Sequence, residues 1–118
     1  YRRLPRVAAV HHVHTVASTL ARPLDGAVPG ALRFRDLEMI KGWGLWEPGV
    51  EACLPVLANH PHVPDIARDL SEWLSEPRAV PAMLIAGHGL TAWGDTLDET
   101  LRHVEITEFM CRLARASA

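Results

Sequence analysis

Short apolar runs alternate along the chain with segments whose apolar residues recur at helical spacing. Small and β-branched residues dominate the apolar runs, and this composition is typical of strands. The pattern predicts strands at residues 6–14, 31–34, 54–58, 82–86 and 90–93. It predicts helices at residues 15–22, 37–41 and 64–74 and from residue 95 onward. Because strands alternate with helices, we expect an α/β fold.

A few residues predict where individual elements begin, end or lie. Asp36 is the expected N-cap of the second helix, and Gly42 is its expected end. Pro55 lacks a backbone N–H, which favours an edge position or a strand start for the run at 54–58. In the last helix, Thr96 and Glu99 have the spacing of a capping box.

The composition is that of one small soluble domain. The 118 residues are 48% hydrophobic and 22% charged, with a net charge of −2. This balance gives no electrostatic reason to expect nucleic acid or an anionic membrane as a partner. No apolar run approaches the length that spans a bilayer. Two cysteines, Cys53 and Cys111, do not make a disulfide framework, and without a secretory signal pattern the predicted location is the cytoplasm.

The histidines carry the clearest sign of chemistry. His12 and His14 lie two residues apart on the first predicted strand, so their side chains point the same way, with Cα atoms about 7 Å apart. His11 falls on the opposite face. His88 follows the fourth predicted strand between two glycines, which let backbone and metal approach closely. The three imidazoles predict a catalytic metal site with one open position, and a histidine pair packed in a sheet is the alternative.

The chain contains a second His-x-His, at His60-Pro61-His62. Pro61 and Pro64 predict a turn there, and two imidazoles in a turn need not face the same way. We therefore do not expect this copy to bind a metal.

A metal that polarises a carbonyl group needs a carboxylate nearby to move protons. Glu38 is the candidate, because Leu37, Met39 and Ile40 place apolar side chains around it. Apolar surroundings desolvate a carboxylate, which suits an acid/base catalyst. The alternative is a solvated Glu38 with Lys41 as an ion-pair partner or an exposed neighbour.

Three segments, taken in order, resemble the class II aldolase/adducin family: His12-Val13-His14, Glu38-Met39-Ile40-Lys41-Gly42, and Gly87-His88-Gly89-Leu90 with Trp93-Gly94. Within the family, the Glu-Met-Ile-Lys-Gly string is similar to the methylthioribulose-1-phosphate dehydratases of methionine salvage. The resemblance extends through nearly the whole chain. It implies a layered fold with a central, mostly antiparallel sheet and flanking helices.

The resemblance also implies a site and a reaction. The site would be one zinc ion per subunit, held by His12, His14 and His88, with Glu38 as the acid/base residue. The implied activity is that of a lyase that dehydrates 5-methylthioribulose 1-phosphate to 2,3-diketo-5-methylthiopentyl 1-phosphate. Its partner is therefore a small phosphorylated sugar rather than nucleic acid or a membrane.

Family members are commonly homotetramers with active sites near subunit contacts, so the tryptophans are candidates for pocket or interface positions as well as for the core. These residues are Trp43, Trp46 and Trp93. Family domains run to about 200 residues, and their glycine- and serine-rich phosphate turns have no counterpart here. We therefore expect residues 1–118 to be a single domain that is incomplete at its N-terminus. A related sugar-phosphate aldolase or epimerase, or a non-catalytic adducin-like module, is the alternative function.

Overall fold

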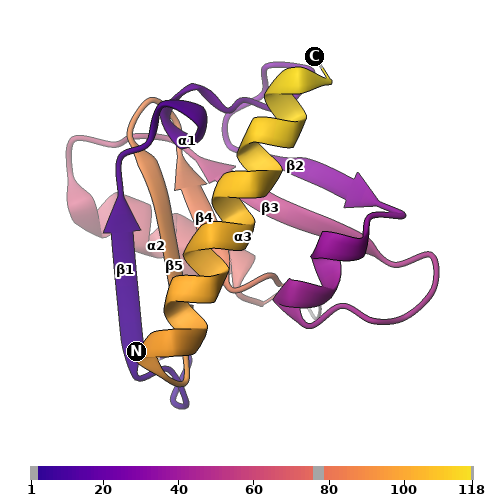
Figure 1. The fold of residues 1–118 in the computed structure, drawn as a ribbon. Coiled ribbons are helices and arrows are strands. Elements are labelled where there is room, and N and C mark those ends of the chain that lie inside the picture. The colour runs from indigo at the N-terminus through magenta and orange to yellow at the C-terminus, as the bar shows by residue number, and fades with distance from the viewer. Residues whose placement is uncertain (1–2, 76–78, 118) are drawn as a thin grey trace.

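The computed structural model describes residues 3–75 and 79–117, and its centre is a five-stranded sheet (Figure 1). The elements follow the chain in this order: β1 (Ala9–Val13), α1 (Val16–Leu20), β2 (Gly30–Arg35), the 3-10 helix η1 (Glu38–Trp43), β3 (Glu51–Leu57), α2 (Val63–Trp73), β4 (Ala82–Ile85), β5 (Gly89–Gly94) and α3 (Leu97–Ala116). The alternation of strands and helices confirms the α/β class. No helix in the described ranges is long and apolar enough to cross a membrane.

The strand directions determine where loops meet. The order across the sheet is β1-β5-β4-β3-β2, and each neighbouring pair is antiparallel except β3 with β4, which is parallel. The expected mostly antiparallel sheet is therefore confirmed. Strands β1, β4 and β3 run in one direction, whereas β5 and β2 run in the other. The carboxyl ends of β1, β4 and β3 consequently lie at the same end of the sheet.

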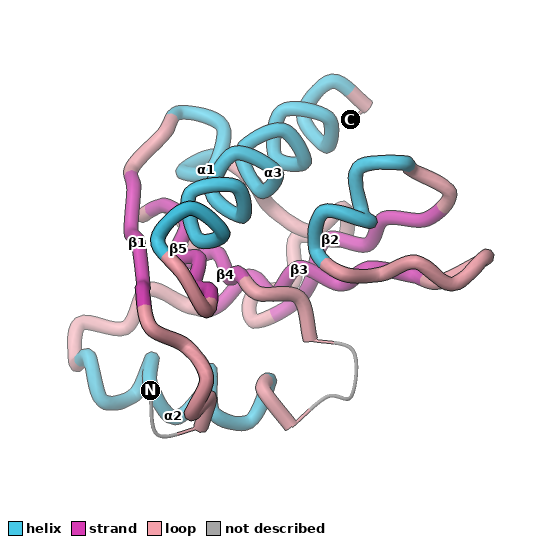
Figure 2. The backbone as a smooth tube through the Cα atoms, turned by 60° about the horizontal axis from the view of Figure 1, so that its bottom comes forward, coloured by secondary structure: helices cyan, strands magenta, loops and turns pink. Residues whose placement is uncertain are grey.

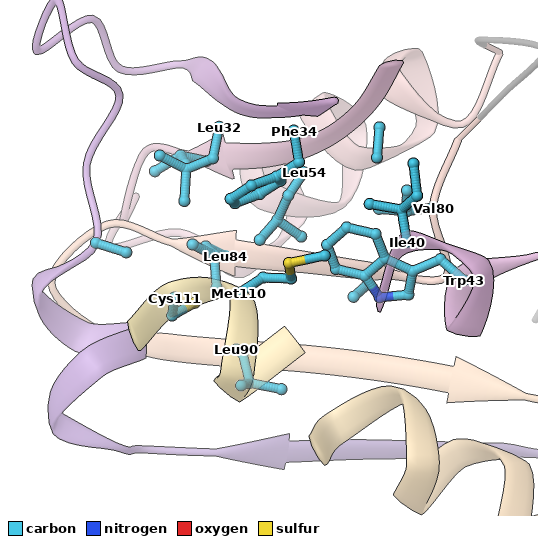
Figure 3. Packing of buried hydrophobic residues seen from close by; sticks show 14 of the residues in the cluster. Leu32, Phe34, Ile40, Trp43, Leu54, Val80, Leu84, Leu90, Met110 and Cys111 are labelled. Carbon is cyan, nitrogen blue, oxygen red and sulfur yellow. The ribbon is translucent and has the colours of Figure 1, made fainter. Parts of the chain in front are cut away.

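Helices cover both faces of the sheet (Figure 2). On one face, α3 packs with α1 and η1, and Met110 of α3 lies against Leu54, Leu84 and Leu90 in a core whose side chains are fully buried (Figure 3). Burying a leucine of this kind contributes about 1.5–3 kcal/mol. On the other face, Ile66 of α2 belongs to a smaller cluster with Leu57, Met83, Ile85 and Trp93. The two clusters make the sheet a rigid platform for the loops at its ends.

The prediction that Pro55 marks an edge is wrong. Strand β3 lies between β4 and β2, where a missing N–H would normally break a ladder. The β4 strand pairs with β3 only at Val56 and Leu57, so Pro55 precedes that ladder and its missing N–H is not needed. The position is tolerated because pairing on one side of β3 starts one residue later.

The second helix also differs from its prediction. It is a 3-10 helix that begins after Leu37, without a side-chain cap, and Asp36 instead adopts a left-handed backbone conformation at φ 58°. The helix continues past Gly42 and ends at Gly44, whose φ of 87° and N–H bond to the Lys41 carbonyl give a glycine C-cap. The later glycine is the one that adopts the left-handed conformation.

The last helix has half of its predicted capping box. The Thr96 side chain accepts the N–H of Glu99, as expected. The Glu99 carboxylate accepts the N–H of Asp95, however, one residue before the position that a capping box uses.

Candidate metal centre

The end of the sheet where β1, β4 and β3 terminate brings three imidazoles together. His12 lies near the end of β1, His14 follows that strand, and His88 lies in the turn from β4 to β5. One ring nitrogen from each histidine lies within 4.8 Å of the other two. Nε2 of His12 is 2.8 Å from Nε2 of His14, and the ring centroids are 4.7 to 4.9 Å apart. In the described residues this is the single such cluster of three or more His, Cys, Asp or Glu.

Gly89 permits the close approach of the two halves of the cluster. Its φ is 150°, and a Cβ at this position would lie 2.3 Å from the Val13 carbonyl oxygen and 3.1 Å from the His14 ring. A side chain here would therefore separate the start of β5 from the end of β1. The glycine keeps His88, one residue earlier, within reach of His14.

The residue after His14 is anchored to the long helix. Thr15 is the N-cap of α1 and forms a reciprocal capping box with Ser18. The Thr15 hydroxyl also lies 2.9 Å from Oε1 of Glu108 on α3. These bonds hold the strand-to-helix junction that carries His14 against the core side of the sheet.

Two further residues contact the Nδ1 atoms of His12 and His88. Nδ1 of His12 lies 2.9 Å from the Thr91 hydroxyl, and Nδ1 of His88 lies 3.3 Å from Oδ1 of Asn59. Sequence reasoning missed both as site residues, because they enter only when β1 is known to pair with β5 and β3 with β4. The signal that could have found Asn59 is its place just after a strand end, a position similar to that of His14.

The pKa of His12 is lowered from its usual value. Burial is the largest cause, followed by the charges that His88 and His14 would carry, while a hydrogen bond to the Leu90 backbone opposes the shift. His12 therefore stays neutral to a lower pH than a free imidazole, and the neutral form is the one that binds metal.

The donor set fits a divalent metal. Zinc holds imidazole nitrogens at about 2.0–2.1 Å, so two nitrogens on one tetrahedral ion are roughly 3.3 Å apart. The nitrogen separations here are of that size, since those of His12 and His14 are 2.8 Å apart and no pair is more than 4.8 Å apart. His12 and His14 are exposed, which leaves an open side for a small molecule. Neutral imidazoles also suit copper, iron and nickel.

Glu38 does not have the apolar surroundings that its neighbours in the sequence suggested. Its side chain is 82% exposed and forms an ion pair with Lys41, with an Nζ–Oε1 distance of 2.9 Å. The tight turn of η1 directs Ile40 into the core and leaves Glu38 and Met39 on the outside. Within this chain Glu38 is a solvated carboxylate, the alternative that its neighbours left open.

Glu38 is also far from the imidazoles. It follows β2, which lies at the opposite edge of the sheet from β1 and runs in the opposite direction. The six residues of β2 separate the two ends of the sheet by about 20 Å. Figure 1 shows η1 and the carboxyl end of β1 at opposite corners of the molecule. One chain does not bring Glu38 to the cluster.

The other predicted groups have separate surroundings. His60 bonds to Asp69 at 2.8 Å, and His62 lies 3.6 Å from Asp65, so the second His-x-His pairs with carboxylates of α2.

The tryptophans divide between core and surface. Trp43 and Trp93 are buried in the two core clusters. Trp46 is 68% exposed, with the Lys41 ammonium 5.1 Å from its ring centroid. It is the one of the three that remains available for a contact outside this chain.

Comparison with known proteins identifies the family to which this fold belongs. Residues 1–115 match the family described as Class II Aldolase and Adducin N-terminal domain, and the chain belongs to that family. A methylthioribulose-1-phosphate dehydratase of Microcystis aeruginosa is 37% identical over 113 residues, which are 95% of this chain and 54% of the relative. The enzyme of the same name from Bacillus subtilis is 39% identical over 84% of this chain and 46% of its own length.

A solved structure supports the same fold. YgbL of Escherichia coli, described as a candidate aldolase/epimerase/decarboxylase, superposes with a TM-score of 0.72 at 28% identity. The match covers 96% of this chain and 50% of YgbL. The chain thus spans about half the length of the relatives it matches.

Proposed function

We propose that this chain provides the metal ligands and the acid/base residue of a zinc-dependent methylthioribulose-1-phosphate dehydratase. The convergence of three imidazoles on one open-sided point carries the proposal, in a chain whose relatives bear that name. The reaction would convert 5-methylthioribulose 1-phosphate to 2,3-diketo-5-methylthiopentyl 1-phosphate. We assign it to methionine salvage in the cytoplasm, where Cys53 and Cys111 would stay reduced.

In the proposed reaction, His12, His14 and His88 hold the ion and fix the orientation of the substrate's carbonyl end. Bound zinc supplies Lewis acidity that favours negative charge on an oxygen. Glu38 takes the proton from the carbon next to the carbonyl and returns it to the hydroxyl group on the following carbon, which leaves as water. The resulting enol takes up its keto form, which gives the second carbonyl.

Glu38 would act on the imidazole cluster of a neighbouring copy rather than on its own. The opposite placement of the two groups in one chain supports this arrangement. In a ring built from head-to-tail contacts, such as a four-fold symmetric tetramer, one surface of each subunit meets a different surface of the next, so opposite edges come into contact. A homotetramer, which the family resemblance implies, would form four equivalent sites in this way.

Exposed apolar residues at both edges support the same arrangement. Val16, two residues after His14, is 72% exposed, and Trp46, which contacts the ion-pair partner of Glu38, Lys41, is 68% exposed. Large exposed apolar side chains next to polar functional groups are typical of contact surfaces. Contact with a neighbouring copy would remove water from Glu38 and give it the environment that an acid/base carboxylate needs.

Mixing two inactive variants tests the shared site. Glu38→Gln and His88→Ala should each abolish dehydration when assayed alone, in the intact protein. If Glu38 acts on its neighbour, co-assembled variants should recover about a quarter of the sites, because those sites combine one intact histidine set with one intact Glu38. Recovery is read from product formation after the variants are unfolded and refolded together. No recovery in mixed oligomers, confirmed by mass spectrometry, would contradict the shared site.

An aldolase or epimerase is the second candidate, and the likeness to YgbL favours it. Glu38→Gln separates the two functions, because an aldolase with its acid elsewhere would keep its activity. Zinc content separates both from a non-catalytic module. Less than about half an equivalent of zinc per chain after mild purification would favour the module.

A further inference from the structure

The three imidazoles differ in what their Nδ1 atoms contact. Nδ1 of His12 lies 2.9 Å from the Thr91 hydroxyl, and Nδ1 of His88 lies 3.3 Å from Oδ1 of Asn59. In the described part of the chain, no hydrogen bond reaches Nδ1 of His14. The His12 nitrogen that faces the cluster is Nε2, at 2.8 Å from His14. Thr91 therefore lies on the side of the His12 ring away from the cluster. Asn59 contacts Nδ1 of His88, which leaves Nε2 of that ring as the nitrogen available to a metal.

We infer that Thr91 and Asn59 are positioning residues that fix the tautomers of His12 and His88, an inference that rests on the proposed metal centre. A neutral imidazole carries one N–H, so a partner that accepts a hydrogen bond from Nδ1 leaves Nε2 with a free lone pair. The Asn59 Oδ1 atom only accepts, so the His88 Nδ1 must donate. Such outer partners also set ring orientation and ligand basicity.

The Thr91 hydroxyl can donate or accept. It must accept if Nε2 of His12, the nitrogen that faces His14, is to bind an ion, because the neutral ring then carries its proton on Nδ1. With Nδ1–H donating to Thr91, Nε2 of His12 accepts from Nε2–H of His14 across their 2.8 Å contact. His14 would then be the ligand that changes its tautomer when an ion binds.

The two positioning residues are held with different rigidity. Thr91 is the direct cross-strand partner of His12 in the β1–β5 pair, so the ladder itself fixes the two side chains on one face. Asn59 lies in the loop after β3, is exposed, and makes the longer of the two contacts. We therefore expect Thr91 to contribute more to metal affinity than Asn59 does.

Zinc affinity of the full chain gives the first readout, measured by competition with a chromophoric chelator. Thr91→Val removes the hydroxyl at nearly constant volume and should weaken zinc binding about tenfold to a hundredfold. Thr91→Ser restores the hydroxyl and should bind within about threefold of the native chain. Asn59→Ala should weaken zinc binding, but less than Thr91→Val does. Asn59→Asp keeps the acceptor oxygen and should not weaken zinc binding. Thermal unfolding curves verify that each variant is folded.

Ring nitrogen chemical shifts of the metal-free chain give a second readout, which does not depend on zinc. We expect the Nδ1–H form for His12 and His88 in the native chain, and a shift of His12 toward Nε2–H in Thr91→Val but not in Thr91→Ser. A native chain that binds no zinc would overturn the proposed metal centre. The tautomers of His12 and His88 would still show whether Thr91 and Asn59 position the rings. Unchanged tautomers, with equal zinc affinity for the Val and Ser variants, would overturn the inference alone.

Discussion

The chain holds two His-x-His segments, and the structure uses them differently. His12 and His14 lie at the end of an extended strand and direct their rings to one point, where His88 meets them. His60 and His62 lie in the bend before α2 and turn to two separate carboxylates of that helix. The spacing is identical, so the difference comes from the backbone and from the neighbours that the fold supplies.

The comparison shows what a spacing motif needs in order to become a site. Alternation along a strand gives two rings a common direction, but the third ring comes from a strand end that is distant in the sequence. The second copy has carboxylates nearby instead, and each histidine pairs with one of them. A metal centre therefore depends on which loops the sheet topology gathers, in addition to the motif.

The largest expected difference is in metal affinity after loss of one ring from each copy. His14→Ala should weaken zinc binding more than about a hundredfold, because a residue that binds the metal directly contributes more than a residue that hydrogen-bonds to a ligand. His62→Ala should leave the affinity within about twofold. Isothermal titration with zinc measures both variants. Comparable losses in the two would mean that the second copy also takes part in binding.

The next expected effect concerns the close approach at Gly89. Gly89→Ala adds backbone strain and a collision with the Val13 carbonyl, and should lower the free energy of unfolding by about 1–3 kcal/mol. Zinc affinity should fall as well, because His88 moves away from His14. Gly49→Ala is the matched control, since its φ is 74° and no atom lies within 4 Å of the added Cβ. A Gly89 variant that resembles the control would show that β5 can shift without moving the cluster.

A smaller effect is expected from the partner of His60. Asp69→Asn removes the carboxylate from a half-exposed pair and should lower the free energy of unfolding by up to about 1 kcal/mol. Zinc affinity should not change. Urea denaturation with and without zinc separates the two quantities. Tighter zinc binding in this variant would show that Asp69 competes with a metal for His60.

The smallest effect is a control on the integrity of the hydrophobic core. Burial raises the pKa of the Cys111 thiol to about 12, with the charge of Glu108 adding to the shift. At pH 8 a thiol reagent should therefore label the half-exposed Cys53 first and Cys111 only as fast as the chain unfolds. Because the folded pKa exceeds the unfolded value of 9.0, the free energy of unfolding should fall as the pH rises from 9 toward 12. Rapid labelling of Cys111 in a histidine variant would mean that the core has opened.

The sequence was sufficient for the elements and for the imidazole cluster, but not for distances across the sheet. Period-two alternation and the glycines around His88 carry enough information to select His12, His14 and His88. The predicted apolar environment of Glu38 was wrong because the adjacent apolar residues of a short helix point in different directions, and of Met39 and Ile40 only Ile40 is buried. Neighbours in the sequence predicted burial that the tight turn of η1 does not provide.

Pairing partners explain the other misses. Thr91 and Asn59 carry no motif, and their contacts exist only because particular strands lie side by side. Pro55 suggested an edge because it lacks a backbone N–H, but the ladder on its β4 side starts only at Val56, one residue later. Strand order is a property of the whole chain, and local pattern does not encode it.

The position of β1 at the border of the sheet has a consequence for dynamics. Within the described residues this strand has one neighbour, β5, so its amide protons should exchange with solvent sooner than those of β4, which has two. An ion bound by His12, His14 and His88 would cross-link the edge strand β1 to the turn between β4 and β5. Amide exchange in residues 9–13 should then slow when zinc is added, which would make β1 a built-in reporter of metal loading.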